Sequence, residues 1–365
     1  MSQKIYDYVV IGAGVSGSCT AFELSKYTSN ILLIDKLGDV SSGASGAAGA
    51  FLSPLLGKPN NFKDLVNIAL VYSTEFYKQN TPDSINNCGT VRIPKDDKDR
   101  EKFESYKPYI EFDYVEKDDG YYFPIASVVN GYEACKTITK DIEKLLNFQV
   151  NTIEYKQDYW LINDTIKSKN IILSNGVCID LMEEKYFNIR PVWGQRIVCK
   201  TSTCIDVNYH KECSLAQTKK IDINTYITSI GATHHRNVYE KQINNSDTQE
   251  LLRKANMIKK LEDIEVIAAY AGARASSVDY FPMLGELIDA QKTLEEFPYL
   301  KHGTHVKSER FTKYKNLYVI NGVGGRGFVL APYLASKLCE MLFEFKELDS
   351  DLKVDRLFLR WVKKA

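Results

Sequence analysis

The stretch IYDYVVIGAGVSG, residues 5–17, decides the fold of this chain. Residues 5–11 form an apolar run, which predicts a strand buried on both faces, as in a parallel sheet. A turn with three glycines follows, and the segment 18–27 then has the composition of a helix. A second apolar run at 31–34 ends at Asp35. This order predicts a complete βαβ unit of a nucleotide-binding α/β domain.

The glycine turn and the acid after it indicate a dinucleotide site. Gly12 permits the sharp turn from strand to helix, Gly14 lets a pyrophosphate approach the backbone, and Gly17 lets the helix pack closely on the strand. Amide groups at the start of the helix face the phosphates, and Asp35 lies where a carboxylate accepts hydrogen bonds from a ribose. Because strand, helix and acid all accompany the motif, we favour this interpretation over an ordinary glycine-rich turn.

Later segments favour FAD over NAD, which shares the same fingerprint. The small-residue run SSGASGAAGAFLSP at 41–54 can lie against a large planar ligand, although a flexible linker has a similar composition. A short apolar strand at 317–320 leads into a second glycine-rich turn at 321–328, a late element that closes over the flavin in two-domain FAD enzymes. A third apolar strand ends at Asn175 and Gly176, as expected beside the same cofactor.

The predicted cofactor is therefore FAD, and no His or Cys occupies an obvious attachment motif, so we expect it to be non-covalent. The residues predicted to bind it come from these four segments: Gly12, Ala13, Gly14, Ser16, Gly17, Asp35, Lys36, Ala44, Ser45, Gly46, Gly49, Asn175, Gly176, Gly324, Gly325, Arg326, Gly327 and Phe328.

The remaining sequence is more polar and shows the alternation of antiparallel strands. We therefore expect an α/β fold in which a Rossmann-type FAD-binding domain is interrupted by a substrate domain with an antiparallel sheet. The FAD-binding domain is predicted to comprise 1–87, 131–190 and 316–365, and the substrate domain 88–130 and 191–315.

Composition limits the classes of function. The 47 Lys and Arg residues balance 47 Asp and Glu, which excludes a general nucleic-acid binder held by net charge but not a local basic rim. No stretch has the length or apolarity of a membrane span, and the N-terminus does not resemble a signal peptide, so we expect a cytoplasmic protein. The eight cysteines are scattered singly, which indicates reduced thiols rather than a metal site or disulfides.

Segments from one end of the chain to the other resemble the D-amino-acid oxidase and glycine oxidase family of flavoproteins. They are GAGVSG at 12–17, GASGAAGAFLSPLL at 43–56, YYFPIASVVN at 121–130, IRPVWGQ at 189–195, IGAT at 230–233, AGARASSVDYFPMLG at 271–285, VGGRGFVLAP at 323–332 and DRLFLRWVKK at 355–364. The second and the last are most similar to the C-terminal oxidoreductase domain of the MnmC enzymes of tRNA 5-methylaminomethyl-2-thiouridine biosynthesis.

The resemblance implies an FAD-dependent oxidase that removes the carboxymethyl group of 5-carboxymethylaminomethyl-(2-thio)uridine at the wobble position of tRNA. The products would be 5-aminomethyl-(2-thio)uridine and glyoxylate. The family position of Arg274 implies that it binds the substrate carboxylate, and Arg326 is the second catalytic candidate, on the substrate or the flavin edge. His234 and His235 are weaker candidates, and no acid–base residue or oligomeric state is assigned.

The chain departs from the family pattern at Ala47, Val278 and Gly325, where the family has Asn, Arg and Ser. These departures leave open an oxidase of free glycine, sarcosine or a D-amino acid. A third interpretation is a non-catalytic flavoprotein that is the partner of a separate methyltransferase. Because the βαβ unit begins at residue 5, we expect any methyl transfer to require another polypeptide.

Overall fold

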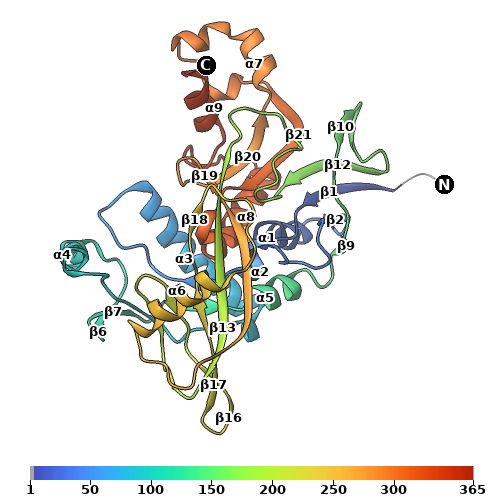
Figure 1. The fold of residues 1–365 in the computed structure, drawn as a ribbon. Coiled ribbons are helices and arrows are strands. Elements are labelled where there is room, and N and C mark those ends of the chain that lie inside the picture. The colour runs from blue at the N-terminus through green and yellow to red at the C-terminus, as the bar shows by residue number, and fades with distance from the viewer. Residues whose placement is uncertain (1–3, 365) are drawn as a thin grey trace.

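A computed structural model describes residues 4–364 and contains a large mixed sheet at the centre of the fold (Figure 1). Neighbouring strands of its central part are parallel, in the order β9-β2-β1-β12-β21. Their bounds are β1 Ile5–Ile11, β2 Ile31–Ile34, β9 Glu143–Leu145, β12 Ile166–Leu173 and β21 Lys313–Asn321. Antiparallel strands complete the eight-stranded sheet: β10 Ile153–Lys156, β11 Tyr159–Ile162 and β20 Met283–Ile288.

Both faces of this sheet are buried, which explains the uninterrupted apolar runs of its strands. Val10 and Leu33 pack in one hydrophobic core, whereas their neighbours Val9 and Leu32 pack in another on the opposite face. The first core is formed with α1 Val15–Ser25, α3 Asn61–Asn80, α5 Gly131–Ile138 and α8 Gly327–Glu344. The second is formed with α7 Ala290–Glu296 and α9 Asp355–Val362, at the top of Figure 1.

A ten-stranded sheet extends from the other side of the molecule. Its longest strands, β13 Ile189–Thr201 and β19 Glu265–Ser277, pair antiparallel over almost their whole length. The others are β5 Thr90–Arg92, β6 Val115–Lys117, β7 Gly120–Phe123, β14 Asn208–His210, β15 Ser214–Leu215, β16 Lys219–Asp222, β17 Thr225–Gly231 and β18 His235–Arg236. Helix α6, Asn245–Asn256, packs on this sheet and closes a third core.

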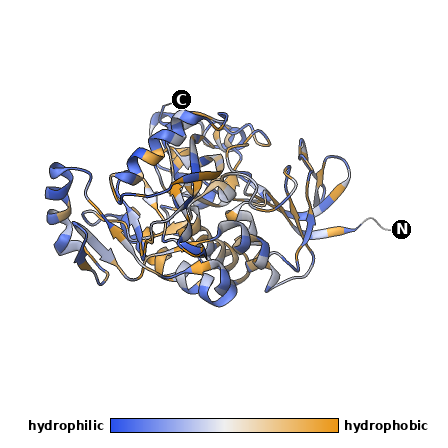
Figure 2. Ribbon diagram, turned by 60° about the horizontal axis from the view of Figure 1, so that its bottom comes forward, coloured by the Kyte–Doolittle hydropathy of each residue, from blue (hydrophilic) through white to orange (hydrophobic). Residues whose placement is uncertain are grey.

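The remaining elements are short. They are α2 Ala44–Ala47, α4 Asp97–Tyr106, the three-stranded sheet of β3 Phe51–Leu52, β4 Ile85–Asn86 and β8 Ser127–Val129, and the 3-10 helices η1 Pro82–Ser84, η2 Lys107–Tyr109, η3 Pro298–His302, η4 Ser308–Arg310 and η5 Gly324–Arg326. Apolar residues gather along the central strands, whereas α4 at the edge is mainly hydrophilic (Figure 2). Only Phe103 of α4 is buried.

The α/β fold with an additional antiparallel sheet is confirmed. The domain boundaries stay a prediction, and strand pairing crosses them at β8, which pairs with β3 and β4, and at β20. Strand β20 falls in 191–315, the range predicted for the substrate domain, yet it pairs with β21 at the edge of the eight-stranded sheet. Local polarity does not reveal such a long-range pairing, because the partner of a strand is set by contacts between segments that are far apart in the sequence.

Two further observations bear on the expectations from composition. None of the helices in the described residues is long and apolar enough to cross a membrane. All eight cysteines have free thiols.

Candidate active site

One large cavity, of about 1040 Å³, is lined by both sheets. From the eight-stranded sheet come the carboxyl ends of β1, β2 and β21 and the residues that follow β12, and from the ten-stranded sheet come β5, β13, β14 and β19. The carboxyl edge of a parallel sheet is where α/β proteins bind ligands. The volume is at the upper end of the range for small-molecule sites, so an extended cofactor and a substrate can share this space.

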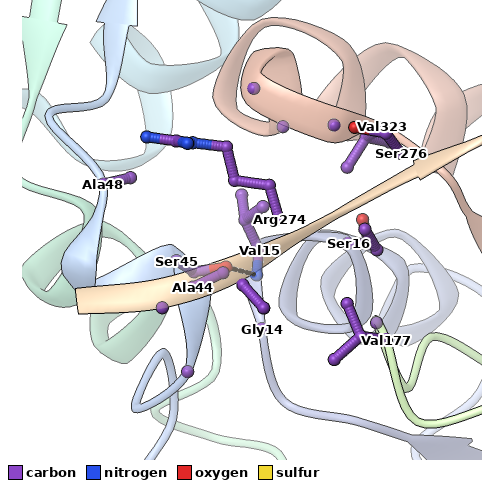
Figure 3. Close-up of a pocket in the computed structure, with 18 of the residues that line it drawn as sticks. Gly14, Val15, Ser16, Ala44, Ser45, Ala48, Val177, Arg274, Ser276 and Val323 are labelled. Atoms are coloured by element: carbon purple, nitrogen blue, oxygen red, sulfur yellow. Dashed lines mark hydrogen bonds between the residues drawn. The ribbon is translucent and has the colours of Figure 1, made fainter. Parts of the chain in front are cut away.

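In the first glycine turn, positions 12 and 17 have room only for glycine. Gly12 has a φ of +106°, and a Cβ there would lie 2.4 Å from the Ser174 carbonyl oxygen. A Cβ at Gly17 would lie 1.8 Å from the Gly12 carbonyl oxygen, so α1 approaches the strand as closely as the motif predicts. Ser45 Oγ accepts a hydrogen bond from the Val15 amide at 2.9 Å (Figure 3).

The start of α1 is suited to an anion. Its N-cap residue, Gly14, supplies no side-chain hydrogen bond, and the first turn contains no acidic residue. Amide groups of that turn have no partner within the helix, and the helix dipole places positive potential there.

Asp35 has a structural task as well as the predicted one. Its Oδ2 accepts a hydrogen bond from the Ala13 amide at 2.6 Å and its Oδ1 accepts one from the Leu37 amide at 2.8 Å. The carboxylate therefore holds the glycine turn in place while it lines the cavity.

The small-residue segment is pinned by the ten-stranded sheet. Arg196 on β13 donates to the carbonyl oxygens of Ala47 at 3.0 Å and Gly46 at 3.2 Å, and its guanidinium stacks on Tyr270 at 4.6 Å. Strand β19 crosses the same segment so closely that a Cβ at Gly272 would lie 2.7 Å from Ala44 Cα. The segment is therefore a fixed wall of the cavity and not a flexible linker.

The predicted residues around 176 lie at one end of the cavity. Asn321 Nδ2 donates to the Gly176 carbonyl oxygen at 2.9 Å, which ties the third apolar strand to the late glycine turn. Asn175 Nδ2 donates to the carbonyl oxygen of Cys178. Lys36 Nζ lies 3.0 Å from Cys178 Sγ, so these side chains close the cavity beside Asp35.

Arg274 extends from β19 across the cavity toward Ala48 (Figure 3). Gly194 on β13 leaves the space for its guanidinium, because a Cβ there would lie 2.4 Å from Nη2. Nη1 donates to the Thr233 carbonyl oxygen at 3.3 Å, and no carboxylate of residues 4–364 forms an ion pair with this guanidinium. Burial lowers the pKa of Arg274 to about 10. A half-buried cation without a counter-ion is suited to a ligand carboxylate.

Arg326, which belongs to the late glycine turn, lies near Arg274 of β19. A Cβ at the adjacent Gly325 would lie 3.7 Å from Arg274 Cδ. Burial lowers the pKa of Arg326 to about 10, and its guanidinium forms no ion pair within the described part of the chain. The two predicted catalytic arginines therefore line one cavity, and neither is ion-paired with an acid of the described residues.

Most of the residues predicted to form the site line this cavity. Three do not: Ala13, Gly17 and Gly46 lie behind the lining. Ala13 acts through its amide on Asp35, whereas the two glycines permit close backbone packing, since a Cβ at Gly46 would lie 2.2 Å from the Ser41 carbonyl oxygen.

Of the two weaker histidine candidates, only one lines the cavity. His234 lines the cavity, and partial burial together with the charge of Arg274 lowers the pKa of His234 to about 4, so its imidazole is neutral at pH 7. His235 Nε2 instead lies 2.9 Å from Asp247 Oδ2, in a network with Lys241 outside the cavity.

Sequence reasoning missed Arg92, Trp193 and His210, which also line the cavity. Arg92 and His210 become neighbours through the pairing of β5 with β14. The alternation of polar and apolar residues in TVR and NYH could have suggested that each short strand has one polar face. Nothing local indicates that these two strands pair.

The model of the FAD dependent oxidoreductase family DAO matches residues 7–341, and the chain belongs to this family of FAD-dependent enzymes. The bifunctional tRNA 5-methylaminomethyl-2-thiouridine biosynthesis protein MnmC of Campylobacter jejuni is 24% identical over 354 residues, which cover 93% of this chain and 56% of that protein. The MnmC of Legionella pneumophila is 23% identical over 365 residues, with 92% and 54% covered. The chain spans about half the length of the curated relatives it matches.

Among solved structures, glycine oxidase from Bacillus cereus has the same fold, with a TM-score of 0.75, 17% identity and coverage of 94% of this chain and 96% of that one. The residues present suit FAD. The turn excludes a Cβ at Gly12, the first turn of α1 has no side-chain cap and no acidic residue, and the cavity continues past Asp35 to the arginines.

Proposed function

We propose that this FAD-dependent oxidoreductase removes the carboxymethyl group from 5-carboxymethylaminomethyl-(2-thio)uridine at the wobble position of tRNA. The observation that carries the proposal is the guanidinium of Arg274, directed into the cavity without an acidic partner in the described chain. A carboxymethylamine presents the carboxylate that such a cation binds. The names of the MnmC relatives support a tRNA base as the carrier of this group.

The cofactor would be held by the features already described. We assign its pyrophosphate to the first turn of α1 and its ribose to Asp35, which faces the same end of the cavity. The walls formed by residues 43–50 and 322–327 would hold the flavin, between α1 and Arg274. Bound FAD supplies the two-electron acceptance that protein side chains lack.

The reaction removes a hydride equivalent from the carbon between the carboxylate and the amine, which makes a carbon–nitrogen double bond. Water adds to that carbon, the original carbon–nitrogen bond breaks, and glyoxylate leaves the primary amine on the base. Arg274 orients the carboxylate so that this carbon faces the part of the cavity assigned to the flavin, between residues 43–50 and 322–327. His234 stays neutral above its pKa of about 4, so it adds no charge that would repel the substrate amine.

A second candidate function is the oxidation of a free small amine such as glycine, sarcosine or a D-amino acid. The fold shared with a glycine oxidase and the departures at Ala47 and Val278 favour it. In both functions Arg274 would bind the carboxylate. A non-catalytic flavoprotein associated with a separate methyltransferase is a third proposal, because the MnmC relatives are bifunctional and about twice as long.

The test is to incubate the FAD-loaded protein with tRNA that carries the carboxymethylaminomethyl group, and to measure glyoxylate and the mass of the modified nucleoside. We expect loss of the carboxymethyl group. An unchanged nucleoside with rapid turnover of sarcosine would overturn the tRNA function in favour of the second candidate. A flavin that no amine reduces, in a protein that binds a methyltransferase, would indicate the third.

A further inference from the structure

The wall of the cavity formed by β5 and β14 contains polar residues that the proposed reaction does not use. The two strands pair in parallel, with Thr90 opposite Asn208 and Arg92 opposite His210. Because side chains alternate along a strand, Thr90, Arg92 and His210 lie on one face, and all three line the cavity. Their neighbour Val91 faces the third hydrophobic core instead.

Two buried donors on this wall have no partner. Thr90 Oγ1 and Arg92 Nε are inaccessible to solvent and make no hydrogen bond with any described residue. Thr90 is 1% exposed, and both residues line the cavity. Buried polar atoms without partners are rare because each loses its hydrogen bonds with water and gains none in return. Their convergence on one cavity wall indicates a ligand with several acceptor atoms.

The charge on this wall is positive and uncompensated. Arg92 Nη1 donates to Ser53 Oγ at 3.1 Å and to the Pro54 carbonyl oxygen at 3.2 Å, both of them neutral. No acid of the part described, 4–364, forms an ion pair with Arg92. Asp99 acts on it only from beyond ion-pair distance.

The other titratable groups near this wall do not neutralise the charge of Arg92. Burial, followed by the charge of Arg326, lowers the pKa of Arg92 to about 10. Burial together with the charges of Arg92 and Arg326 lowers the pKa of His210 far below its usual value, so this histidine is neutral at pH 7. Glu212 also lines the cavity, but its carboxylate lies 3.8 Å from Lys254 Nζ.

We propose that Thr90 and Arg92 form a second anion subsite, separate from Arg274, for a carboxylate or phosphate on the other substituent of the reacting amine. The inference rests on the proposed function, in which Arg274 binds the carboxymethyl carboxylate and leaves this wall for the rest of the substrate. Arg326 stands between the two subsites, since its charge acts on Arg92 while the adjacent Gly325 lies against Arg274. The anion is one of two kinds: a second carboxylate of a small amine, or a nucleotide phosphate.

Two pairs of ligands separate these sources. The first pair is sarcosine and iminodiacetate, which differ by a second carboxylate. The second pair is 5-carboxymethylaminomethyluridine and its 5′-monophosphate. Each is titrated into the FAD-loaded protein without oxygen, and the concentration dependence of the flavin absorbance change gives an apparent dissociation constant. We expect one member of a pair to bind about tenfold more tightly or better, the effect of a charge-assisted hydrogen bond.

The variants assign that preference to this wall. Arg92→Met should reduce the ratio within the responding pair to about one, Arg92→Lys should retain part of it, and Thr90→Val, which removes only the hydroxyl, should lower it a few-fold. Arg190→Met, at an exposed position of β13 outside the cavity lining, is the matched control and should keep the wild-type ratio. Thermal midpoints report whether the lost contacts of Arg92 with Ser53 and Pro54 affect folding.

Equal binding within both pairs for the wild type would overturn the proposal, as would a preference that Arg92→Met leaves intact. A response to iminodiacetate alone assigns the subsite to a second carboxylate, and a response to the monophosphate alone assigns it to a nucleotide phosphate. The first pair involves no nucleotide. The protein can therefore prefer iminodiacetate in an Arg92-dependent way and yet leave the carboxymethylaminomethyl group of tRNA unchanged. That pair of results would support the subsite and refute the tRNA function.

Discussion

Replacing Arg274 by Met tests the assignment of the substrate carboxylate. In the structure the guanidinium makes one hydrogen bond, at 3.3 Å to the Thr233 carbonyl oxygen, so most of its donors are available to a ligand. A charge-assisted hydrogen bond contributes about 1.5–3 kcal/mol. Its loss should therefore lower kcat/KM for a carboxymethylamine about 10- to 150-fold. The FAD content should be unchanged, because our assignment gives Arg274 to the substrate and not to the cofactor.

The assay is the rate of flavin reduction at increasing concentrations of the amine, with FAD content measured from the absorbance of the purified protein. Gly194→Ala is a companion variant that keeps the charge. Its Cβ would lie 2.4 Å from Nη2 and 2.6 Å from Nη1 of Arg274, so the guanidinium must move, and 2.5 Å from the Thr233 carbonyl oxygen. We expect a loss of kcat/KM in the same direction. Arg190→Met, at an exposed position of β13 outside the cavity lining, is the control for removal of a cation.

Unchanged kinetics in Arg274→Met would refute the reasoning, because the carboxylate must then be bound elsewhere. Loss of FAD from this variant with normal kinetics of the remaining holoenzyme would refute it as well, since Arg274 would then belong to the cofactor site.

Three further outcomes follow from the structure. Asp35→Asn weakens both bonds to the amides of Ala13 and Leu37, so FAD should bind about tenfold less tightly in a fluorescence titration, and unchanged affinity would contradict the role of Asp35. Arg196→Met leaves the carbonyl oxygens of α2 without their donor and should lower the free energy of unfolding by about 1–3 kcal/mol in denaturant titrations; no change would show that α2 is held without it. The pKa of His210 is lowered in the folded state, so the unfolded chain takes up the proton first and stability should fall from pH 7 to pH 5, by at most about 1.4 kcal/mol per pH unit from this residue. His210→Gln should flatten that slope in thermal unfolding, and an equal slope would contradict the shift.

The βαβ unit and both glycine turns were predictable because their determinants are local. The strand, the turn and the helix of residues 5–25 follow one another without a gap, and each imposes its own composition. The spacing from Gly12 to Asp35 follows from the length of one helix and one strand, so the sequence alone indicates that the acid returns to the turn. Arg274 was found through resemblance to the family and not through a local pattern, whereas Arg326 lies within the late glycine-rich turn that the sequence itself marks.

The sequence by itself therefore determined the class of fold, the family and the cofactor, since each rests on short continuous motifs. Only the tertiary structure decided which side chains share the cavity with them. Arg92 lies beside His210 because β5 pairs with β14. The guanidinium of Arg274 has space because the neighbouring strand β13 has a glycine, Gly194, next to it. The register of strands that lie far apart in the chain is set by packing on both faces of a sheet, which no local pattern records. The balanced net charge of the chain likewise conceals Arg92, Arg274 and Arg326, which line one cavity and form no ion pair with a described acid, because a sum over residues contains no distances.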